Sequence, residues 1–354
     1  MAVPGARFRG SLRAGPLTPG FRGPTIRRIM RVLSGIQPSG QLHVGNFFGA
    51  VRQFLKLQEE GHECFYFLAN YHALTSIQDA ARLAELTRHL ATGYLALGID
   101  PDRSVFFCQS DVPQVTELCW MLNCVCPVSL MEKAHSYKDK IARGLAASMG
   151  LFDYPVLQAA DILIYDSNLV PVGQDQKQHV EMTRDLAIKF NRAYGAEVLV
   201  VPEPYILSAV AVVPGIDGQK MSKSYNNTIE IFLTPKQTKK RVAQIVTDST
   251  PLEDAKDPEA CNVFALLRLF ADDAEIEELA GKYRAGGYGY GHAKGRLTEL
   301  INEAFAPARE RHEQLLKDPD YVRDVLRDGG RKAREVAEAT MARVRDAAGI
   351  VTHR

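Results

Sequence analysis

The chain has 354 residues, of which 46% are hydrophobic and 24% are charged, and its net charge is +1. This composition is typical of a globular protein with a sizeable core and room for two domains, and no apolar run approaches the roughly 18 residues of a membrane span. Residues 1–31 hold seven arginines and no acidic residue, which leaves −6 for the other 323 residues. A nucleic-acid partner therefore cannot be inferred from overall charge and would need a local basic patch.

The segment before Met30 is rich in Gly, Pro and Arg and lacks an apolar core, so it is not a secretory signal. Three interpretations of residues 1–29 stay open. Met30 could be the true start, because the ordered pattern begins at the next residue. The segment could also be a disordered basic extension or an organellar transit peptide.

From Arg31 onward, short apolar runs alternate with amphipathic stretches. The strands that we expect span residues 31–36, 63–69, 104–109 and, last, 197–201. The helices that we expect span residues 45–60, 80–98, 112–124 and 178–191, and residues 161–165 form a further apolar stretch. Apolar strands that alternate with helices predict a doubly wound α/β fold, with a parallel sheet covered on both faces.

After residue 235 the pattern changes to long, charged, amphipathic stretches with almost no strand signal. The stretches cover residues 261–270, 274–284, 292–305 and 320–348. We therefore predict an α/β domain over residues 30–234 and an α-helical domain over residues 235–354.

The six cysteines predict no metal site. They are Cys64, Cys108, Cys119, Cys124, Cys126 and Cys261. No C-x-x-C pair occurs, and the spacing of the central three fits neither zinc nor an iron–sulfur cluster. Most lie among apolar neighbours, where a reduced cysteine behaves as a small hydrophobic residue. A reducing, cytosol-like compartment fits this usage best.

One short segment, Lys220-Met221-Ser222-Lys223-Ser224, carries two ammonium groups and two hydroxyls in five residues. Gly and Asn residues flank it, which indicates a mobile, cationic loop suited to a phosphate chain. On its own, such a run is typical of a solvated surface loop.

A second motif, His43-Val44-Gly45-Asn46, follows a predicted strand and a Gly-rich turn and opens a predicted helix. The backbone amides at such a helix start favour anions. His43 can donate to a phosphate oxygen, and Gly45 leaves the backbone open to a nucleotide. Residues 37–39 form the loop above. Neither G-x-G-x-x-G nor a Walker loop is present, which argues against the usual dinucleotide and P-loop folds.

Together, Gly-Ile-Gln-Pro-Ser-Gly at residues 35–40, the motif at 43–46 and the loop at 220–224 resemble class I aminoacyl-tRNA synthetases. The chain is most similar to the bacterial and organellar tryptophan–tRNA ligases of that class. Further similar segments are residues 154–163, 170–179, 183–186, 246–249 and 286–289. The resemblance implies that a tryptophan carboxylate attacks the α-phosphorus of ATP, and that a tRNA hydroxyl then takes the aminoacyl group.

The resemblance also assigns residues to ATP. His43 and Asn46 would meet the phosphates, and Lys220, Lys223 and Lys138 would stabilise the triphosphate as pyrophosphate leaves. The other implied ATP contacts are Gln37, Pro38, Ser39, Gly45, Gly173, Gln174, Asp175, Val212, Met221, Ser222 and Ser224. Mg²⁺ would accompany the triphosphate, and no dedicated protein cage for it is visible.

Asp161 is the candidate for amino-acid specificity, because a carboxylate in an apolar stretch is costly without a partner. It could also be a helix N-cap. In the family this aspartate receives the indole N–H, and such a site rejects analogues that lack the group by a factor on the order of 10⁴. The other implied tryptophan contacts are Leu33, Gly35, His72, Tyr154, Val170, Val172 and Gln176.

Three positions depart from the family pattern. Gln174 stands where Glu is usual, and Gln158 stands where many bacterial members have Met. The stretch that ends at Gln219 is one residue shorter than the common pattern, which affects the contact carried to Val212. These departures indicate a divergent branch with the same reaction.

The resemblance implies three further properties of the chain. They are a homodimer, a cytoplasmic location (organellar if residues 1–29 are a transit peptide) and a helical domain that binds tRNA(Trp). Lys239, Lys240 and Arg241 could meet that tRNA or could be a solvated helix face. Two alternatives stay open: a tyrosine–tRNA ligase, and a catalytically silent relative that binds RNA or a protein partner.

Overall fold

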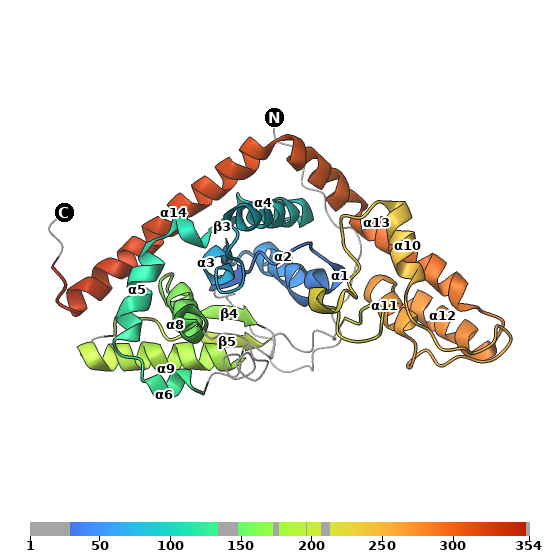
Figure 1. Cartoon of the computed structure of the whole chain (residues 1–354), viewed down its shortest axis with the longest axis horizontal. Coiled ribbons are helices and arrows are strands. Elements are labelled where there is room, and N and C mark those ends of the chain that lie inside the picture. The colour runs from blue at the N-terminus through green and yellow to red at the C-terminus, as the bar shows by residue number, and fades with distance from the viewer. Residues whose placement is uncertain (1–28, 134–147, 173–176, 196, 207–212, 352–354) are drawn as a thin grey trace, which may run out of the picture.

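A five-stranded parallel sheet forms the centre of the molecule, with strand order β3-β2-β1-β4-β5 (Figure 1). The computed structural model describes residues 29–133, 148–172, 177–195, 197–206 and 213–351. The strands are β1 (Arg31–Ile36), β2 (Glu63–Leu68), β3 (Ser104–Cys108), β4 (Leu169–Val172) and β5 (Glu203–Ile206). The interpretations of residues 1–28 lie outside the described residues.

Both faces of the sheet are buried, as the apolar strands predict. Successive residues of β1–β3 alternate between two hydrophobic clusters: Val32, Tyr66 and Phe106 belong to one, and Leu33, Phe65 and Phe107 to the other. Helices α2 (Arg52–Glu59) and α4 (Ala80–Leu97) pack on the first cluster. Helices α5 (Gln114–Asn123), α8 (Met149–Leu163) and α9 (Lys177–Tyr194) pack on the second. The predicted doubly wound fold is confirmed.

Shorter helical elements carry the turns after the strands. They are α1 (Val44–Asn46), the π-helical turn η1 (Phe47–Val51), α3 (Asn70–Ala73), the 3-10 turn η2 (Gln109–Asp111), α6 (Val128–Met131) and the 3-10 turn η4 (Lys223–Tyr225). The predicted helix over residues 45–60 is therefore three consecutive pieces that run from α1 through η1 to α2.

The first three predicted strands are confirmed, but the predicted strand at 197–201 is wrong. The Asn191 side chain takes the backbone partners that a strand would need: its Oδ1 accepts from the amides of Val198 and Leu199, and its Nδ2 donates to the Leu199 carbonyl. The chain stays irregular there, and β5 begins at Glu203. Residues 161–165 are also not a separate element, because α8 extends through most of them.

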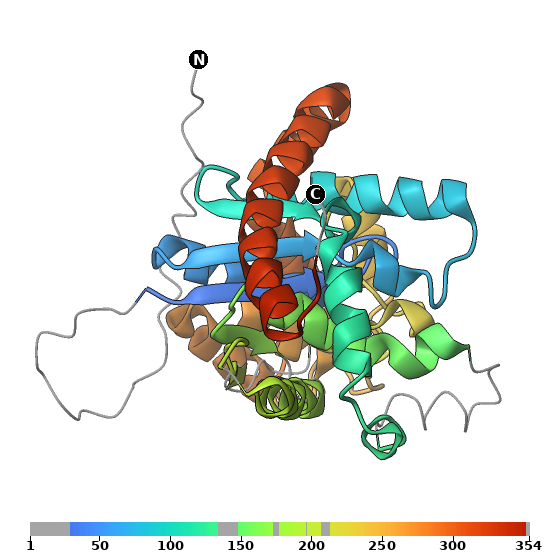
Figure 2. The ribbon, with the colours of Figure 1, turned by 90° about the vertical axis from the view of Figure 1, so that its left-hand side faces the viewer.

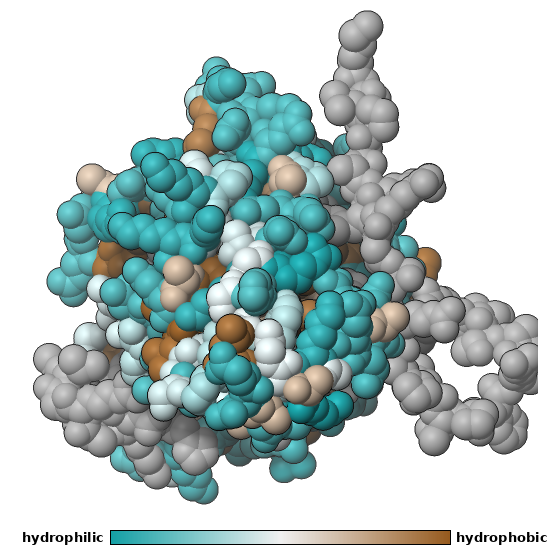
Figure 3. Space-filling model, turned by 90° about the vertical axis from the view of Figure 1, so that its right-hand side faces the viewer, coloured by the Kyte–Doolittle hydropathy of each residue, from teal (hydrophilic) through white to brown (hydrophobic). Residues whose placement is uncertain are grey.

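The helices beyond residue 234 extend from one end of the molecule, and the last of them runs back over the α/β domain (Figure 1). They are α10 (Pro235–Ala243), α11 (Asn262–Phe270), α12 (Asp273–Ala285), α13 (Tyr290–Lys317) and α14 (Pro319–Ala347). Phe264 and Phe305 of this region join the same hydrophobic cluster as α2 and α4, so the core is continuous across residue 235. The surface at this end is mostly hydrophilic, with hydrophobic side chains in small groups (Figure 3).

Helix α14 turns back across the α/β domain (Figure 2). It contacts β3 so closely that a Cβ at Gly329 would lie 1.9 Å from the Phe106 carbonyl oxygen. Arg345 of α14, 7% exposed, pairs with Glu117 of α5 at 2.6 Å. The last helix is therefore part of the α/β core. Within the described residues, no helix has both the length and the apolar character needed to cross a membrane.

Candidate functional site

The predicted site residues that the structure describes gather where the parallel strands end, at the carboxyl edge of the sheet. Open α/β sheets bind their ligands at this edge. Two groups of residues meet there. The loop cluster consists of residues 37–46 after β1 together with residues 220–227. The carboxylate cluster consists of His72, Gln109, Tyr154, Asp161 and His179.

His43 caps α1 in the loop cluster through a reciprocal pair of hydrogen bonds. Its Nδ1 accepts from the Asn46 amide at 3.3 Å, and the Asn46 Oδ1 accepts from the His43 amide at 3.1 Å. Because Nδ1 is an acceptor, the ring proton of neutral His43 lies on Nε2. Burial, and then the charge of Lys223, lower the pKa of His43 from 6.5 to about 4. His43 is therefore a neutral hydrogen-bond donor at neutral pH.

The two predicted phosphate motifs contact each other directly. The Gly45 amide donates to the Met221 sulfur at 3.3 Å, and a Cβ at Gly45 would lie 3.0 Å from the His43 ring. Next to this contact, the Val44 amide donates to the Ile229 carbonyl at 2.9 Å. The loop is thus seated on the start of α1, as the resemblance implies.

Asn227 stabilises the backbone of the loop at residues 220–224 through hydrogen bonds. It is 1% exposed, and its Oδ1 accepts from the Ser222 amide at 2.7 Å. Its Nδ2 donates to Asp217 Oδ1 at 2.8 Å and to the Lys220 carbonyl at 3.1 Å. A single buried amide therefore fixes both sides of the loop, which the sequence motif alone did not predict.

The two lysines of the loop differ in their surroundings. Lys223 Nζ donates to Ser39 Oγ at 3.3 Å, and burial lowers the pKa of Lys223. Lys220 is exposed, as are Gln37, Ser39 and Ser224. Lys223 therefore also joins the loop to the turn after β1, and its positive charge acts on His43.

Asp161 lies at the centre of the carboxylate cluster and is 2% exposed. The Gln109 Nε2 lies 2.9 Å from each carboxylate oxygen, and the His72 Nε2 lies 2.9 Å from Oδ2. Burial raises the pKa of Asp161, and the hydrogen bonds and charge of its partners oppose that rise. The helix N-cap interpretation is wrong, because Asp161 lies near the C-terminal end of α8.

The remaining predicted amino-acid contacts that the structure describes lie on α8 and on the neighbouring strands β1 and β4. Tyr154 OH lies 3.2 Å from His179 Nε2, and its ring lies edge-on to His72 with centroids 6.2 Å apart. Leu33 and Val170 are buried in the second hydrophobic cluster of the sheet, and Val172 is the last residue of β4. Gly35 is exposed, and a Cβ there would lie 2.3 Å from the ring of Phe67. The missing side chain of Gly35 therefore makes room for that ring.

Several predicted residues lie outside the described part of the chain: Lys138, Gly173, Gln174, Asp175, Gln176 and Val212. Sequence reasoning assigned no site role to His179, Asn227 or Gln109. Gln109 lies directly after β3. A polar residue directly after a buried parallel strand is the signal that could have found it.

The three basic residues on α10, Lys239, Lys240 and Arg241, differ in their contacts. Arg241 donates to the carbonyls of Asn226 and Thr228, both at 2.6 Å, and so fixes α10 to the end of the loop cluster. Lys239 and Lys240 are exposed. Arg241 thus has a structural partner, which separates it from its two neighbours.

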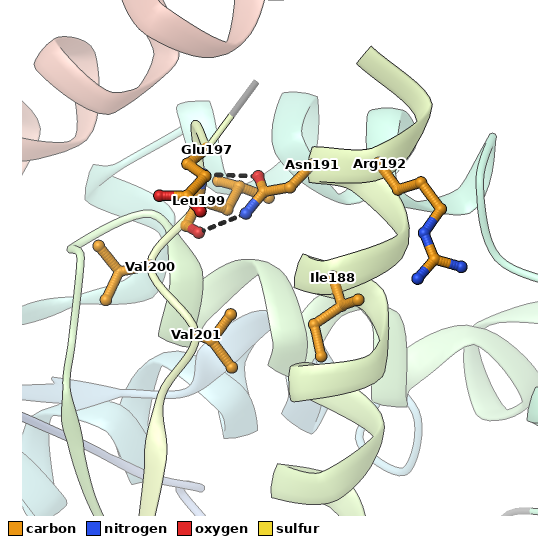
Figure 4. A pocket seen from close by; sticks show the side chains of 7 residues that line it. All are labelled: Ile188, Asn191, Arg192, Glu197, Leu199, Val200 and Val201. Atoms are coloured by element: carbon orange, nitrogen blue, oxygen red, sulfur yellow. Dashed lines mark hydrogen bonds between the residues drawn. The ribbon is translucent and has the colours of Figure 1, made fainter. Parts of the chain in front are cut away.

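A hollow of about 430 Å³ lies beside α9, away from these clusters (Figure 4). Its lining is Ile188, Asn191, Arg192, Glu197, Leu199, Val200 and Val201. None of the site residues named above lines it, so the structure gives it no part in the candidate site.

Comparison with known proteins agrees with this geometry. The chain is 54% identical over 321 residues to the tryptophan–tRNA ligase of Fusobacterium nucleatum, an alignment that covers 91% of this chain and 98% of the relative. The solved structure of the Campylobacter jejuni tryptophanyl-tRNA synthetase in complex with ADP and tryptophan matches with a TM-score of 0.85 and 52% identity, over 90% of this chain and 100% of that one.

A tyrosyl-tRNA synthetase from Archaeoglobus fulgidus shares the fold, with a TM-score of 0.61 and 21% identity over 81% of this chain and 91% of that one. Residues 25–306 match the family described as "tRNA synthetases class I (W and Y)". The chain therefore belongs to the class I tRNA synthetase family of tryptophan and tyrosine enzymes.

Proposed function

We propose that this chain is a tryptophan–tRNA ligase. The carboxylate of tryptophan attacks the α-phosphorus of ATP, pyrophosphate leaves, and tryptophanyl-adenylate forms. A ribose hydroxyl at the 3′ end of tRNA(Trp) then takes the aminoacyl group and releases AMP. The observation that carries the proposal is a buried, hydrogen-bonded Asp161 carboxylate beside a loop cluster built for phosphates. The relatives named for tryptophan, at 54% and 52% identity, support the same substrate.

The loop cluster supplies charge and orientation to the first step, because the attacking carboxylate is already ionised and needs no protein nucleophile. Neutral His43 donates from Nε2 to a phosphate oxygen, and the start of α1 adds backbone amides. Lys223, already held against Ser39, meets the charge of the departing pyrophosphate, with Lys220 on the exposed side. Mg²⁺ bound to the triphosphate would neutralise part of its charge.

The carboxylate cluster favours tryptophan over tyrosine. An ionised carboxylate accepts hydrogen bonds and donates none, so Asp161 suits the indole N–H, which donates and accepts none. A phenol hydroxyl has lone pairs as well as a proton, and Asp161 would leave those lone pairs without a partner. Buried polar groups that lack a partner cost free energy, which gives the discrimination its physical basis.

The partner and location follow from the same family. We propose a homodimer, and large apolar side chains left exposed on α5, α6 and α8 offer a surface for a second copy: Trp120 is 71%, Val128 64% and Met149 75% exposed. The mass of the protein in solution measures this directly. All six cysteines are unpaired, which fits a reducing compartment such as the cytoplasm.

ATP–pyrophosphate exchange tests the function. With the purified chain, tryptophan should support exchange and tyrosine should not. Charging of a tRNA(Trp) transcript then tests the second step. Exchange that depends on tyrosine would make the chain a tyrosine–tRNA ligase, and no exchange with either amino acid would make it a silent relative.

A further inference from the structure

Two buried glutamines lie at opposite ends of β3. Gln58, 5% exposed, lies at the amino end, where its Oε1 accepts from Ser104 Oγ at 2.9 Å. Gln109, 1% exposed, directly follows the carboxyl end. Gln58 ties the start of the strand to α2, while Gln109 faces the carboxylate cluster. The first is therefore a natural comparison for the second.

The Gln109 amide can take only one orientation. Its Oε1 accepts from the Tyr71 amide at 3.0 Å, so its Nε2 must face the carboxylate of Asp161, 2.9 Å from both oxygens. A flipped amide would set two donors, or two acceptors, against each other on both sides. The orientation of this side chain is thus dictated by its partners.

The loops that carry these partners are also joined beside Gln109. Asn70 Nδ2 donates to Ser110 Oγ at 2.7 Å, and the Ser110 amide donates to Asn70 Oδ1 at 3.1 Å. This reciprocal pair locks the turn after β2 to the turn after β3. Gln109 and His72, one on each turn, therefore approach Asp161 from a fixed frame.

Ionisable groups on three elements face Asp161. His72 on α3 donates a hydrogen bond and favours the carboxylate. Cys119 on α5 and Tyr165, just beyond α8, have raised pKa values because of burial first, with the Asp161 charge among the other causes. Neither supplies a positive charge. The charged form of Asp161 consequently depends on His72 and Gln109 alone among these groups.

We propose that Gln109 is a positioning residue that holds the Asp161 carboxylate in the orientation that accepts the indole N–H of tryptophan. Gln109 acts on the amino acid through Asp161. This inference rests on the proposed function, since it names the residue that sets the specificity of that site. It adds a determinant of selectivity that lies in the turn after β3, on a different element from Asp161 in α8.

The test compares Gln109→Leu with the unchanged protein in pyrophosphate exchange. The probes are tryptophan and 3-benzothienylalanine, in which sulfur replaces the indole N–H. The unchanged protein should prefer tryptophan, and Gln109→Leu should reduce that preference, measured as the ratio of kcat/KM values, by about tenfold. The KM for tryptophan should also rise in the variant as the pH falls from 9 to 6, because loss of a donor raises the pKa of Asp161. At saturating tryptophan, kcat should change little.

Gln58→Leu is the matched control, because it removes a buried amide from the other end of the same strand. It should lower Tm to a similar degree and leave both the preference and the pH profile unchanged. Gln109→Asn, which keeps the amide but is one methylene shorter, serves if Gln109→Leu does not fold. Gln109→Asn should reduce the preference for tryptophan and change the KM profile in the same direction as Gln109→Leu, but by less.

A Gln109 variant that loses stability yet keeps the full preference and a flat KM profile would overturn the positioning role. The proposed function fails by a different result, namely that the unchanged protein exchanges with tyrosine or not at all. The two failures are therefore distinguishable in one set of assays.

Discussion

The two halves of the site are built in different ways. The carboxylate cluster is a network of side chains in which Asp161 and Gln109 are 2% and 1% exposed, while His72 and Tyr154 are partly buried. The loop cluster instead joins backbone segments, as in the hydrogen bond from the Gly45 amide to the Met221 sulfur. The Lys220 side chain in this cluster is exposed to solvent. The difference fits the two tasks, since amino-acid selection needs fixed geometry and pyrophosphate departure needs groups that can follow moving charge.

The electrostatics of the halves differ as well. Burial lowers the pKa values of His43 and Lys223 in the loop cluster and raises that of Asp161 in the carboxylate cluster. In both places burial opposes the charged form. Hydrogen bonds with His72 and Gln109 oppose the rise in the pKa of Asp161, whereas the partner of Lys223 Nζ within the described residues is the neutral hydroxyl of Ser39. The loop cluster therefore gains its opposite charge when the anionic substrate binds, whereas Asp161 has its hydrogen-bond partners before any substrate binds.

The largest expected effect comes from Lys223→Ala. Loss of a fixed cation should lower kcat for pyrophosphate exchange by roughly 100- to 1,000-fold, because it acts on charge that develops as pyrophosphate leaves. The KM for tryptophan should stay nearly constant. Lys56→Ala, at an exposed lysine of α2, is the control and should leave both values unchanged. Equal losses in kcat and in tryptophan affinity would make the loop structural.

Asp161→Asn should give the next largest effect, and this effect should be on the KM for tryptophan. The substitution keeps the shape but turns a charged acceptor into a neutral amide, so the KM for tryptophan should rise by about 10- to 100-fold. The KM for ATP should not change. Exchange kinetics with each substrate varied in turn measure both. A parallel rise for ATP would mean that the two halves are not separate.

The smallest effect concerns the protonation of His43. The pKa of His43 is about 4 in the folded protein against 6.5 ordinarily, so the unfolded chain binds a proton first as the pH falls. The contribution of His43 to the unfolding free energy should therefore decrease from pH 6.5 downward and level off below about pH 4. NMR titration of the His43 ring should give a midpoint near 4, and Lys223→Ala should raise it. A midpoint near 6.5 would contradict the buried, neutral state.

The sequence predicted the parts of the fold that rest on local pattern. The strands β1, β2 and β3 contain apolar runs and lie where expected, although β1 also includes Ser34 and Gly35. The strand β4 was not predicted, because it has four residues and includes Pro171, which argues against a strand. The predicted strand at 197–201 failed because one side chain, Asn191, outcompeted sheet pairing. No local pattern reveals such a competitor.

Candidate site residues could be proposed from the sequence where residue types alone carry the chemistry. His43, Lys223 and Asp161 were proposed from charge, spacing and the family resemblance. Gln109 was not, because it lies 52 residues from Asp161 and meets it only through the order of the strands. The neutral state of His43 depends on burial, which is likewise a property of the folded chain.

The contact between α14 and β3 has a consequence for folding during synthesis. β3 ends the strand order, so one of its sides has no strand beside it. Gly329 lets α14 cover that side at the Phe106 carbonyl. An open strand edge pairs readily with other chains, and native proteins protect such edges with helices. Here the protecting helix comes long after β3 in the chain, so during synthesis the α/β domain exposes this aggregation-prone edge until α14 has been made.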